Sequence, residues 1–203
     1  MLRWKRSAGA RAVEGSPLIA PDATLRDVAF TVGTALDRAG IEAVLCGGSA
    51  ATFYAPDVYQ SDDLDFVLTF SGEGEAVVAA LTPLGYSFAN GMFTHPASHF
   101  TVEFPKGPLA IGAETVNRFD TVRDGERVLH VVTATDVVRD RLNKFAAWDD
   151  FSALRAAVGV ALAADVDLGE IRAFMRREGQ GVFRARFEQA LTTFERRVRE
   201  RRL

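Results

Sequence analysis

The sequence predicts an α/β protein, with a small mixed β-sheet flanked by helices and a helical part at its C-terminal end. Three observations predict this fold. Between Thr24 and Val132, segments with helical periodicity alternate with short apolar runs of strand length. Glycine and proline residues separate these runs. From Thr133 onward, every segment has helical periodicity, and the length of 203 residues suits one compact core with a helical appendage.

The predicted core begins with a helix. Residues 1–22 show no periodicity and are interpreted as a flexible leader. From Thr24, apolar residues recur at helical spacing, Thr24 and Asp27 match a capping box, and Gly40 stands where a helix would end. The elements expected next are a strand at 41–46, a helix at 49–54, a strand at 63–70, a helix at 73–83, short strands at 85–89, 92–95, 99–104 and 109–112, and a last strand at 127–132.

The C-terminal part is expected to be a helical region, residues 133–203, packed on a core at 23–132. Its predicted helices are 133–148, 151–163, 168–177 and a final long one. In the final helix an apolar stripe repeats at steps of three or four, formed by Phe183, Phe187, Leu191, Phe194 and Val198. Such a stripe must pack on something, most simply the rest of the same molecule.

Composition excludes several classes of protein. The formal net charge of −3 gives no overall attraction to nucleic acid or to an anionic membrane. The single cysteine, Cys46, excludes an intramolecular disulfide and a cysteine-rich zinc site. No apolar run reaches the ~18 residues of a membrane span, and the basic N-terminus is not followed by a signal-peptide hydrophobic region. We therefore expect a cytoplasmic protein without a membrane partner, and we interpret its arginine-rich ends as solvated.

Two aspartates at the start of the second strand predict a metal site. Strand side chains alternate between faces, so Asp63 and Asp65 share one face while Leu64 and Phe66 lie on the other. Two like charges this close repel each other unless a cation lies between them. Carboxylates are hard oxygen ligands, which suit Mg²⁺ or Mn²⁺.

A glycine pair upstream predicts a phosphate-binding turn. Fourteen residues separate Gly48 from Asp63, enough for a short helix and a return loop. If Gly47, Gly48 and Ser49 form the turn from strand to helix, their backbone N–H groups can bind phosphate, and glycine lets it approach closely. Alone, an Asp-x-Asp sequence is more often a solvated loop and a Gly-Gly pair a tight turn. The two patterns joined in one strand–turn–helix–loop–strand segment are much more specific than either alone. A phosphate-binding turn beside a metal-binding pair of acids is the apparatus of phosphoryl or nucleotidyl transfer.

This arrangement resembles the DNA-polymerase-beta-like nucleotidyltransferase superfamily over roughly residues 24–165. That superfamily has a hydrophobic residue and Gly-Gly/Ser, a spacer, and then Asp-hydrophobic-Asp/Glu-hydrophobic. The segments 46–49 (CGGS) and 63–66 (DLDF) match this signature. Within the superfamily the chain is most similar to minimal bacterial proteins related to the toxins of abortive-infection toxin–antitoxin systems. In these the aspartate pair follows Ser or Thr, here Ser61.

The resemblance implies further site residues. The superfamily has a third carboxylate on a neighbouring strand, for which Glu103 is the candidate. The alternative is that Glu103 is an ordinary surface residue, as a glutamate on an edge strand usually is. It also has basic residues that contact nucleotide phosphates from a helix that opens with Ser/Thr-x-x-Asp. Arg141 and Lys144 fit this position, Lys144 better, with a surface ion pair to Asp140 or Asp149 as the alternative. His130 is interpreted as structural, and Pro96 rules out a helical zinc pair of His95 and His99.

The function implied is an enzyme, a Mg²⁺-dependent nucleotidyltransferase that moves a nucleoside monophosphate from an NTP to an acceptor. The acceptor can be tRNA, another protein or a small molecule such as an aminoglycoside, and a toxin would have an antitoxin partner. The alternative is a catalytically silent binding or regulatory subunit with the same fold. A nucleic-acid-binding module based on the arginine-rich tail is a third hypothesis, disfavoured by the overall acidity.

Overall fold

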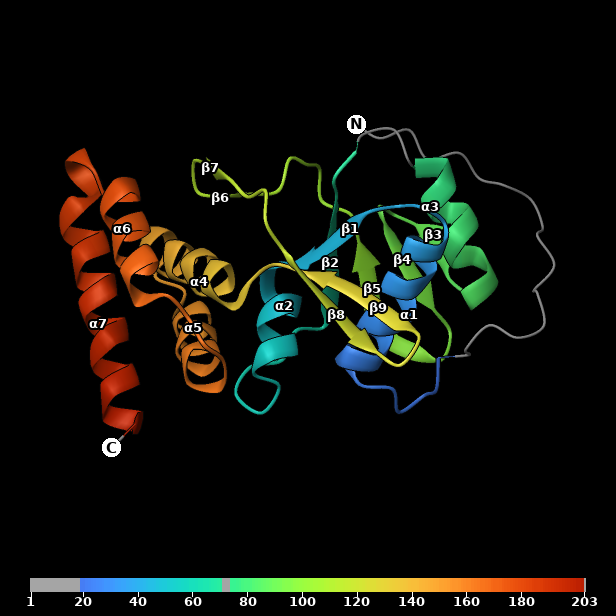
Figure 1. Ribbon diagram of the computed structural model, residues 1–203, viewed down its shortest axis with the longest axis horizontal. Coiled ribbons are helices and arrows are strands. Elements are labelled where there is room, and N and C mark those ends of the chain that lie inside the picture. Colours follow the sequence, from blue (N-terminus) through green and yellow to red (C-terminus); the bar gives the residue numbers. More distant parts are fainter. Residues whose placement is uncertain (1–18, 71–73, 203) are drawn as a thin grey trace. The chain divides into compact units, whose positions relative to one another are not determined.

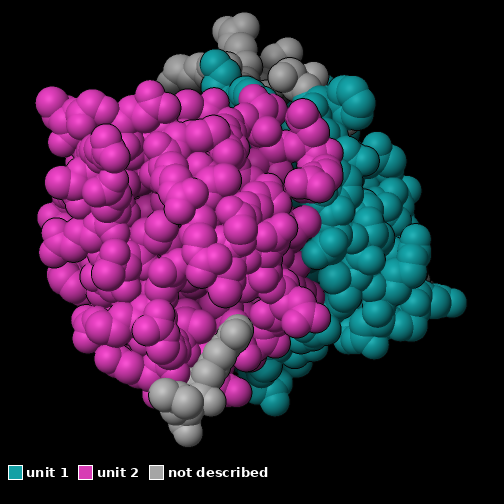
Figure 2. All heavy atoms as spheres, turned by 60° about the vertical axis from the view of Figure 1, so that its left-hand side comes forward, with its two compact units in different colours: residues 1–45, 62–109, 119–131 teal, residues 46–61, 110–118, 132–203 magenta. Residues whose placement is uncertain are grey.

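The computed structural model describes residues 19–70 and 74–202, so most of the predicted leader lies outside the described residues. The chain forms two compact units, shown in different colours in Figure 2. The sheet unit consists of the residues up to 45 together with 62–109 and 119–131. The helical unit consists of residues 46–61, 110–118 and 132–203. Two segments that precede the predicted C-terminal region, 46–61 and 110–118, thus group with its helices.

The sheet unit is a mixed sheet with two helices. Its elements are α1 (Leu25–Arg38), β1 (Ala43–Cys46), β2 (Asp63–Leu68), α3 (Gly74–Leu81), a 3-10 turn (Thr82–Leu84), β3 (Ser87–Ala89), β4 (Met92–His95), β5 (Ser98–Glu103), β8 (Asp120–Asp124) and β9 (Arg127–Val131). The strands are ordered β3-β4-β5-β2-β1-β9-β8. β2 pairs with β5 and β1 with β9 in parallel, while β3–β4, β4–β5 and β8–β9 are antiparallel. The predicted mixed sheet is confirmed.

Helix α1 packs closely on β9. The predicted capping box is present: Asp27 N donates to Thr24 Oγ1 at 3.2 Å, and Thr24 N donates to the Asp27 carboxylate at 3.2 Å. A Cβ at Gly33 would lie 3.0 Å from the Val128 carbonyl oxygen, so glycine allows the helix to approach the strand. α1 and α3 both belong to the sheet unit and contact each other (Figure 1). His130 Nδ1 and Thr121 Oγ1 share a hydrogen bond of 2.9 Å between β9 and β8, which agrees with the interpretation of His130 as a structural residue.

Strand β8 was not predicted, because its sequence is polar and four of its five residues are exposed. It forms an edge strand by pairing with the whole length of β9, from Asp120 opposite Val131 to Asp124 opposite Arg127. An edge strand needs no apolar alternation, because only one side of its backbone pairs and its faces stay in water.

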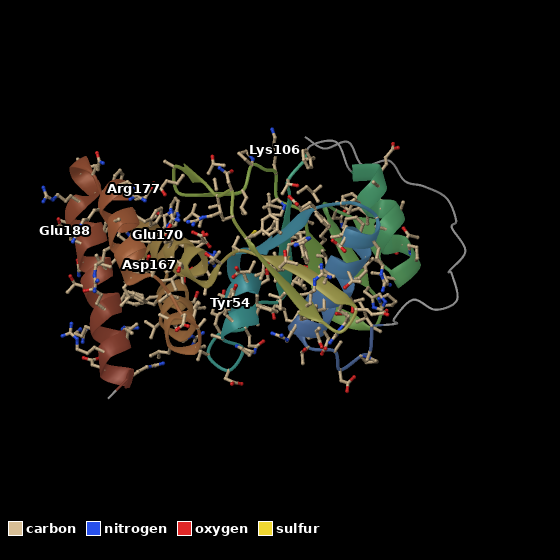
Figure 3. All side chains as sticks on the ribbon, in the orientation of Figure 1. Tyr54, Lys106, Asp167, Glu170, Arg177 and Glu188 are labelled. Carbon is tan, nitrogen blue, oxygen red and sulfur yellow. The ribbon has the colours of Figure 1, made fainter. Side chains whose placement is uncertain are left out.

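The helical unit contains α2 (Gly47–Tyr54), the hairpin β6 (Ala110–Ile111) and β7 (Glu114–Thr115), α4 (Ala134–Trp148), α5 (Phe151–Ala163), α6 (Leu168–Glu178), a 3-10 turn (Gly181–Phe183) and α7 (Arg184–Arg202). Tyr54, labelled in Figure 3, donates to the Val132 carbonyl oxygen at 3.0 Å and so ties α2 to the chain before α4. β7 was not predicted, and β6 is shorter than expected. Figure 1 shows α7 beside α5 and α6, both of which it contacts.

The predicted apolar stripe of the last helix is only partly correct. Phe187, Phe194 and Val198 are buried as expected. Phe183 instead lies in the 3-10 turn before α7 and is 56% exposed. Gly181 begins that turn with a φ of +57°, which takes Phe183 out of the helical repeat.

A buried arginine holds the β6–β7 hairpin to the helices. Arg139 of α4 is 5% exposed and pairs with Asp136 at 2.6 Å, with Glu170 at 3.2 Å, and with Glu114 of β7. Its guanidinium also lies 4.5 Å from the centroid of the Phe174 ring. Arg177 binds the other side of Glu114 at 2.6 Å; Glu170 and Arg177, labelled in Figure 3, both come from α6.

The Glu114 contacts predict a loss of stability in acid. The hydrogen bond from Arg177, with Arg139 adding to it, holds the pKa of Glu114 below its ordinary value of 4.5. Because the folded pKa is the lower one, the contribution is complete above the unfolded pKa and is lost as the pH falls through the folded pKa. We expect Glu114→Gln to show a shallower loss of unfolding free energy below about pH 4.5 than the parent chain. Urea titrations from pH 3 to 7 measure the unfolding free energy, with Asp57→Asn, at an exposed residue, as the control. The same pH dependence of the unfolding free energy in the parent chain and in both variants would contradict the prediction.

Within the described ranges, no helix has the length and apolar character that crossing a membrane requires.

Candidate functional site

Two aspartates and a glutamate lie on one face of the sheet. Asp63 and Asp65 alternate along β2 with Leu64 and Phe66, which are fully buried on the opposite face. β5 runs parallel to β2 and places Glu103 directly opposite Asp65. Neighbouring strands are ~4.8 Å apart, so side chains at paired positions project together from the same face. All three carboxylates are half-buried. The structure therefore places the three predicted carboxylates on the same face of two adjacent strands.

The donor set fits a hard divalent cation. Carboxylate oxygens from two adjacent strands are ligands that Mg²⁺ and Mn²⁺ prefer. Among the residues that the structure describes, no three His, Cys, Asp or Glu side chains are gathered closely enough to hold a metal ion as they stand. An ion would therefore require the carboxylates of Asp63, Asp65 and Glu103 to turn toward it. The backbone register already supplies their common direction.

The glycine turn belongs to the helical unit and is described by itself. α2 begins at Gly47, two residues before the predicted start, with Cys46 as an extended N-cap residue. Gly47 has a φ of +63°, a left-handed conformation that favours glycine. The hydroxyl of Ser49 is buried and donates to the Cys46 carbonyl oxygen at 2.7 Å. The Ser49 side chain thus stabilises the turn, and phosphate binding would fall to the backbone N–H groups of the first helical turn, which lack intrahelical partners.

The structure gives Gly48 a packing role that the sequence did not indicate. A Cβ at this position would lie 2.9 Å from Ser61 Oγ and 3.2 Å from the Tyr59 hydroxyl. The loop that carries these two residues folds back on α2, where Ser61 N donates to Thr52 Oγ1 at 2.9 Å. A larger residue at 48 would therefore have to displace the side chains of Ser61 and Tyr59, whether or not a phosphate approaches there. Tyr59 was missed because nothing in its sequence neighbourhood marks a contact with the turn.

Arg141 and Lys144 differ in their surroundings. Arg141 is 7% exposed and hydrogen-bonds to Asp140, with Nε at 2.9 Å. Burial alone lowers the pKa of Arg141, but Asp140, with smaller contributions from Tyr59 and Cys46, raises it overall, so the guanidinium is charged. α4, which carries Arg141, packs on α2. Lys144 is exposed and forms a surface ion pair at 3.4 Å, but its partner is Asp150 and not Asp140 or Asp149 as considered from the sequence.

The mixed sheet and its helices match a nucleotidyltransferase-like fold. A solved structure with this fold is an antigenic nucleotidyltransferase-like protein from Paracoccidioides brasiliensis, matched with a TM-score of 0.52 at 13% identity over 83% of this chain and 92% of that one. The solution structure of the antibiotic-resistance factor ANT(2'')-Ia also matches, with a TM-score of 0.40 at 12% identity over 82% of this chain and 88% of that one. A TM-score of 0.40 is too low to establish a common fold, so the fold assignment rests on the first protein alone. No family model and no curated protein matches the chain.

Proposed function

We propose that the protein is a metal-dependent nucleotidyltransferase, which transfers a nucleoside monophosphate from an NTP to an acceptor. The observation that carries the proposal is the parallel register of β2 and β5, which lines up Asp63, Asp65 and Glu103 on one face of a nucleotidyltransferase-like fold. A catalytically silent subunit with this fold is the alternative, and the intact carboxylate row argues against it.

The carboxylates would act on the metal and on the acceptor. Asp63, Asp65 and Glu103 would hold Mg²⁺ or Mn²⁺, which when bound supplies Lewis-acid stabilisation of the charge that develops on the phosphate oxygens. The acceptor oxygen attacks the α-phosphorus and forms a new P–O bond, while the bond to pyrophosphate breaks and pyrophosphate leaves. Glu103 would take the proton that the acceptor hydroxyl loses.

The glycine turn would bind the remaining phosphates. Backbone N–H groups at Gly47, Gly48 and Ser49 are donors at a helix N-terminus, which favours anions. Of the two basic candidates we favour Arg141, because its charge is buried and α4, which carries it, packs on α2. Lys144 would contact a phosphate only after leaving Asp150.

Replacing Glu103 by Gln separates its role from that of the two aspartates. The variant keeps the shape of the side chain but loses its charge and basicity. We expect NTP binding to remain, because Asp63 and Asp65 still bind the metal, and the transfer step to slow roughly 10²-fold or more. Single-turnover kinetics measure the step, and Glu75→Gln, an exposed glutamate on α3, is the matched control. An unchanged rate would make Glu103 a surface residue, whose replacement changes stability by at most about 0.5 kcal/mol.

The proposed reaction is tested by incubating the protein with each labelled NTP, Mg²⁺ or Mn²⁺, and an extract of RNA and protein. Label in RNA, in protein or in a small molecule such as an aminoglycoside identifies the acceptor, and no incorporation with any NTP would refute the proposal. A toxin role with an antitoxin partner, and a place in the cytoplasm, remain predictions from the subfamily resemblance and the composition. Co-purification with the product of an adjacent small gene tests the partner.

A further inference from the structure

A groove between α5 and α7 concentrates positive charge. It has a volume of about 280 Å³ and is lined by Phe151, Ser152, Arg155, Val158, Arg197 and Arg201. Phe151, Arg155 and Val158 are four and three residues apart on α5, and Arg197 and Arg201 are four apart on α7, so each set occupies one helical face. The two helices contact each other within the helical unit. Arg197 and Arg201 belong to the C-terminal tail that was expected to be solvated. In the groove they lie together with Arg155 of α5.

No residue in the described ranges neutralises the three arginines. Within the part of the chain that the structure describes, Arg155, Arg197 and Arg201 form no ion pair and no hydrogen bond. Other arginines of α7 do pair, as Arg196 does with Glu200 at 3.4 Å. Two acids are direct sequence neighbours of groove residues: Glu200, which pairs with Arg196, and Asp150, which pairs with Lys144 at 3.4 Å and accepts hydrogen bonds from two backbone N–H groups. Three uncompensated charges in a protein of net charge −3 indicate an anionic ligand.

An exposed aromatic ring adjoins these charges. Phe151 is 60% exposed, although its edge-on contact with Phe145, at 5.2 Å between centroids, fixes its orientation. Positive grooves with exposed aromatic rings bind single-stranded nucleic acids, because arginines bind the phosphates and bases stack on the rings. The volume lies just below the ~300–1,000 Å³ of pockets that enclose a whole small ligand. It suits a chain that passes through the groove better than a ligand enclosed by it.

We propose that the groove between α5 and α7 binds a single-stranded nucleic acid, with Arg155, Arg197 and Arg201 on successive phosphates and a base stacked on Phe151. A single strand is required because the bases of a duplex are already stacked on one another. The binding does not rest on the transfer reaction proposed above, since neither the carboxylates nor the glycine turn takes part in it.

Fluorescence anisotropy with labelled RNA and DNA 12-mers, without NTP or metal, tests the proposal. Three phosphate contacts on a single strand predict a slope of log K against log salt of about −2, a loss of about 20-fold in affinity between 50 and 200 mM salt. Each of Arg155→Gln, Arg197→Gln and Arg201→Gln should make the slope less negative by about 0.7, and the triple variant by about 2. Phe151→Leu should weaken binding about tenfold without changing the slope.

Arg199→Gln is the matched control, because this arginine is exposed on the same helix but does not line the groove. It should leave the slope unchanged, and melting temperatures should show that all variants are folded. Equal slopes for the triple variant and Arg199→Gln would overturn the proposal, as would equal affinity for a duplex of the same sequence. Loss of oligonucleotide binding with intact transfer would refute this inference alone, and loss of transfer with intact binding would refute only the enzyme.

Discussion

Replacing Asp63 or Asp65 by Asn is expected to lower nucleotidyl transfer by roughly 10³-fold or more. The reason is that stabilisation of phosphate charge by a bound metal contributes several kcal/mol to the transition state, and each 1.4 kcal/mol is a factor of ten. Both residues lie on the face of β2 opposite to the buried Leu64. The fold should therefore be unchanged or slightly stabilised, because each substitution removes a charge from a pair of neighbouring carboxylates.

Single-turnover assays at saturating Mg²⁺ and NTP measure this effect, and thermal melts with and without both ligands report the fold. Asp62→Asn is the matched control, since it removes the same charge from the adjacent, exposed residue before the strand. Wild-type rates in both Asp63→Asn and Asp65→Asn would end the nucleotidyltransferase reading. Reduced rates in all three variants alike would mean that overall charge, not the metal site, determines activity.

Replacing Arg139 by Met should destabilise the helical unit by about 3 kcal/mol or more. Methionine keeps the apolar stem against Phe174 but leaves Asp136, Glu114 and Glu170 without their common cation. Asp136 has only 5% of its side chain exposed, so its charge cannot be solvated by water instead. Removing one partner from a buried ion pair typically costs 3–5 kcal/mol for this reason.

Urea unfolding followed by circular dichroism measures the loss. Arg172→Met is the control: Arg172 pairs with Glu195 at 2.6 Å, but 43% of its side chain is exposed, and such pairs contribute about 1 kcal/mol or less. If Arg139→Met costs no more than Arg172→Met, the three carboxylates are satisfied without the arginine, and the hairpin is held by other contacts.

Local patterns predicted the parts of the fold that local chemistry determines. The capping box of Thr24 and Asp27 and the common face of Asp63 and Asp65 follow from neighbouring residues alone, and both are present. β8 could not be predicted, because its polar residues form a strand only by pairing with β9. The contact of Gly48 with Ser61 depends on the path of a loop that folds back on α2.

Residues far apart in the sequence could not be grouped in advance. Arg139 meets Glu114 and Glu170, which are 25 and 31 residues away. The groove joins Arg155 to Arg197 and Arg201 only because α5 packs on α7. In the sequence these arginines were part of an ordinary charged helix and of a basic tail. The position of Glu103 on a strand next to Asp65 was expected from the family resemblance, which implies a third carboxylate on a neighbouring strand. The register of β2 and β5 places Glu103 opposite Asp65.

The interleaving of the two units limits how this protein can be dissected. The chain passes from one unit to the other at 45/46, 61/62, 109/110, 118/119 and 131/132. A fragment ending at residue 131 would keep α2 and the β6–β7 hairpin but lose α4, which both of them contact. A fragment beginning at residue 132 would contain Arg139 without Glu114. Neither half of the gene therefore encodes all the contacts of one unit, and homologous recombination that exchanges one half would separate residues that contact each other in this protein.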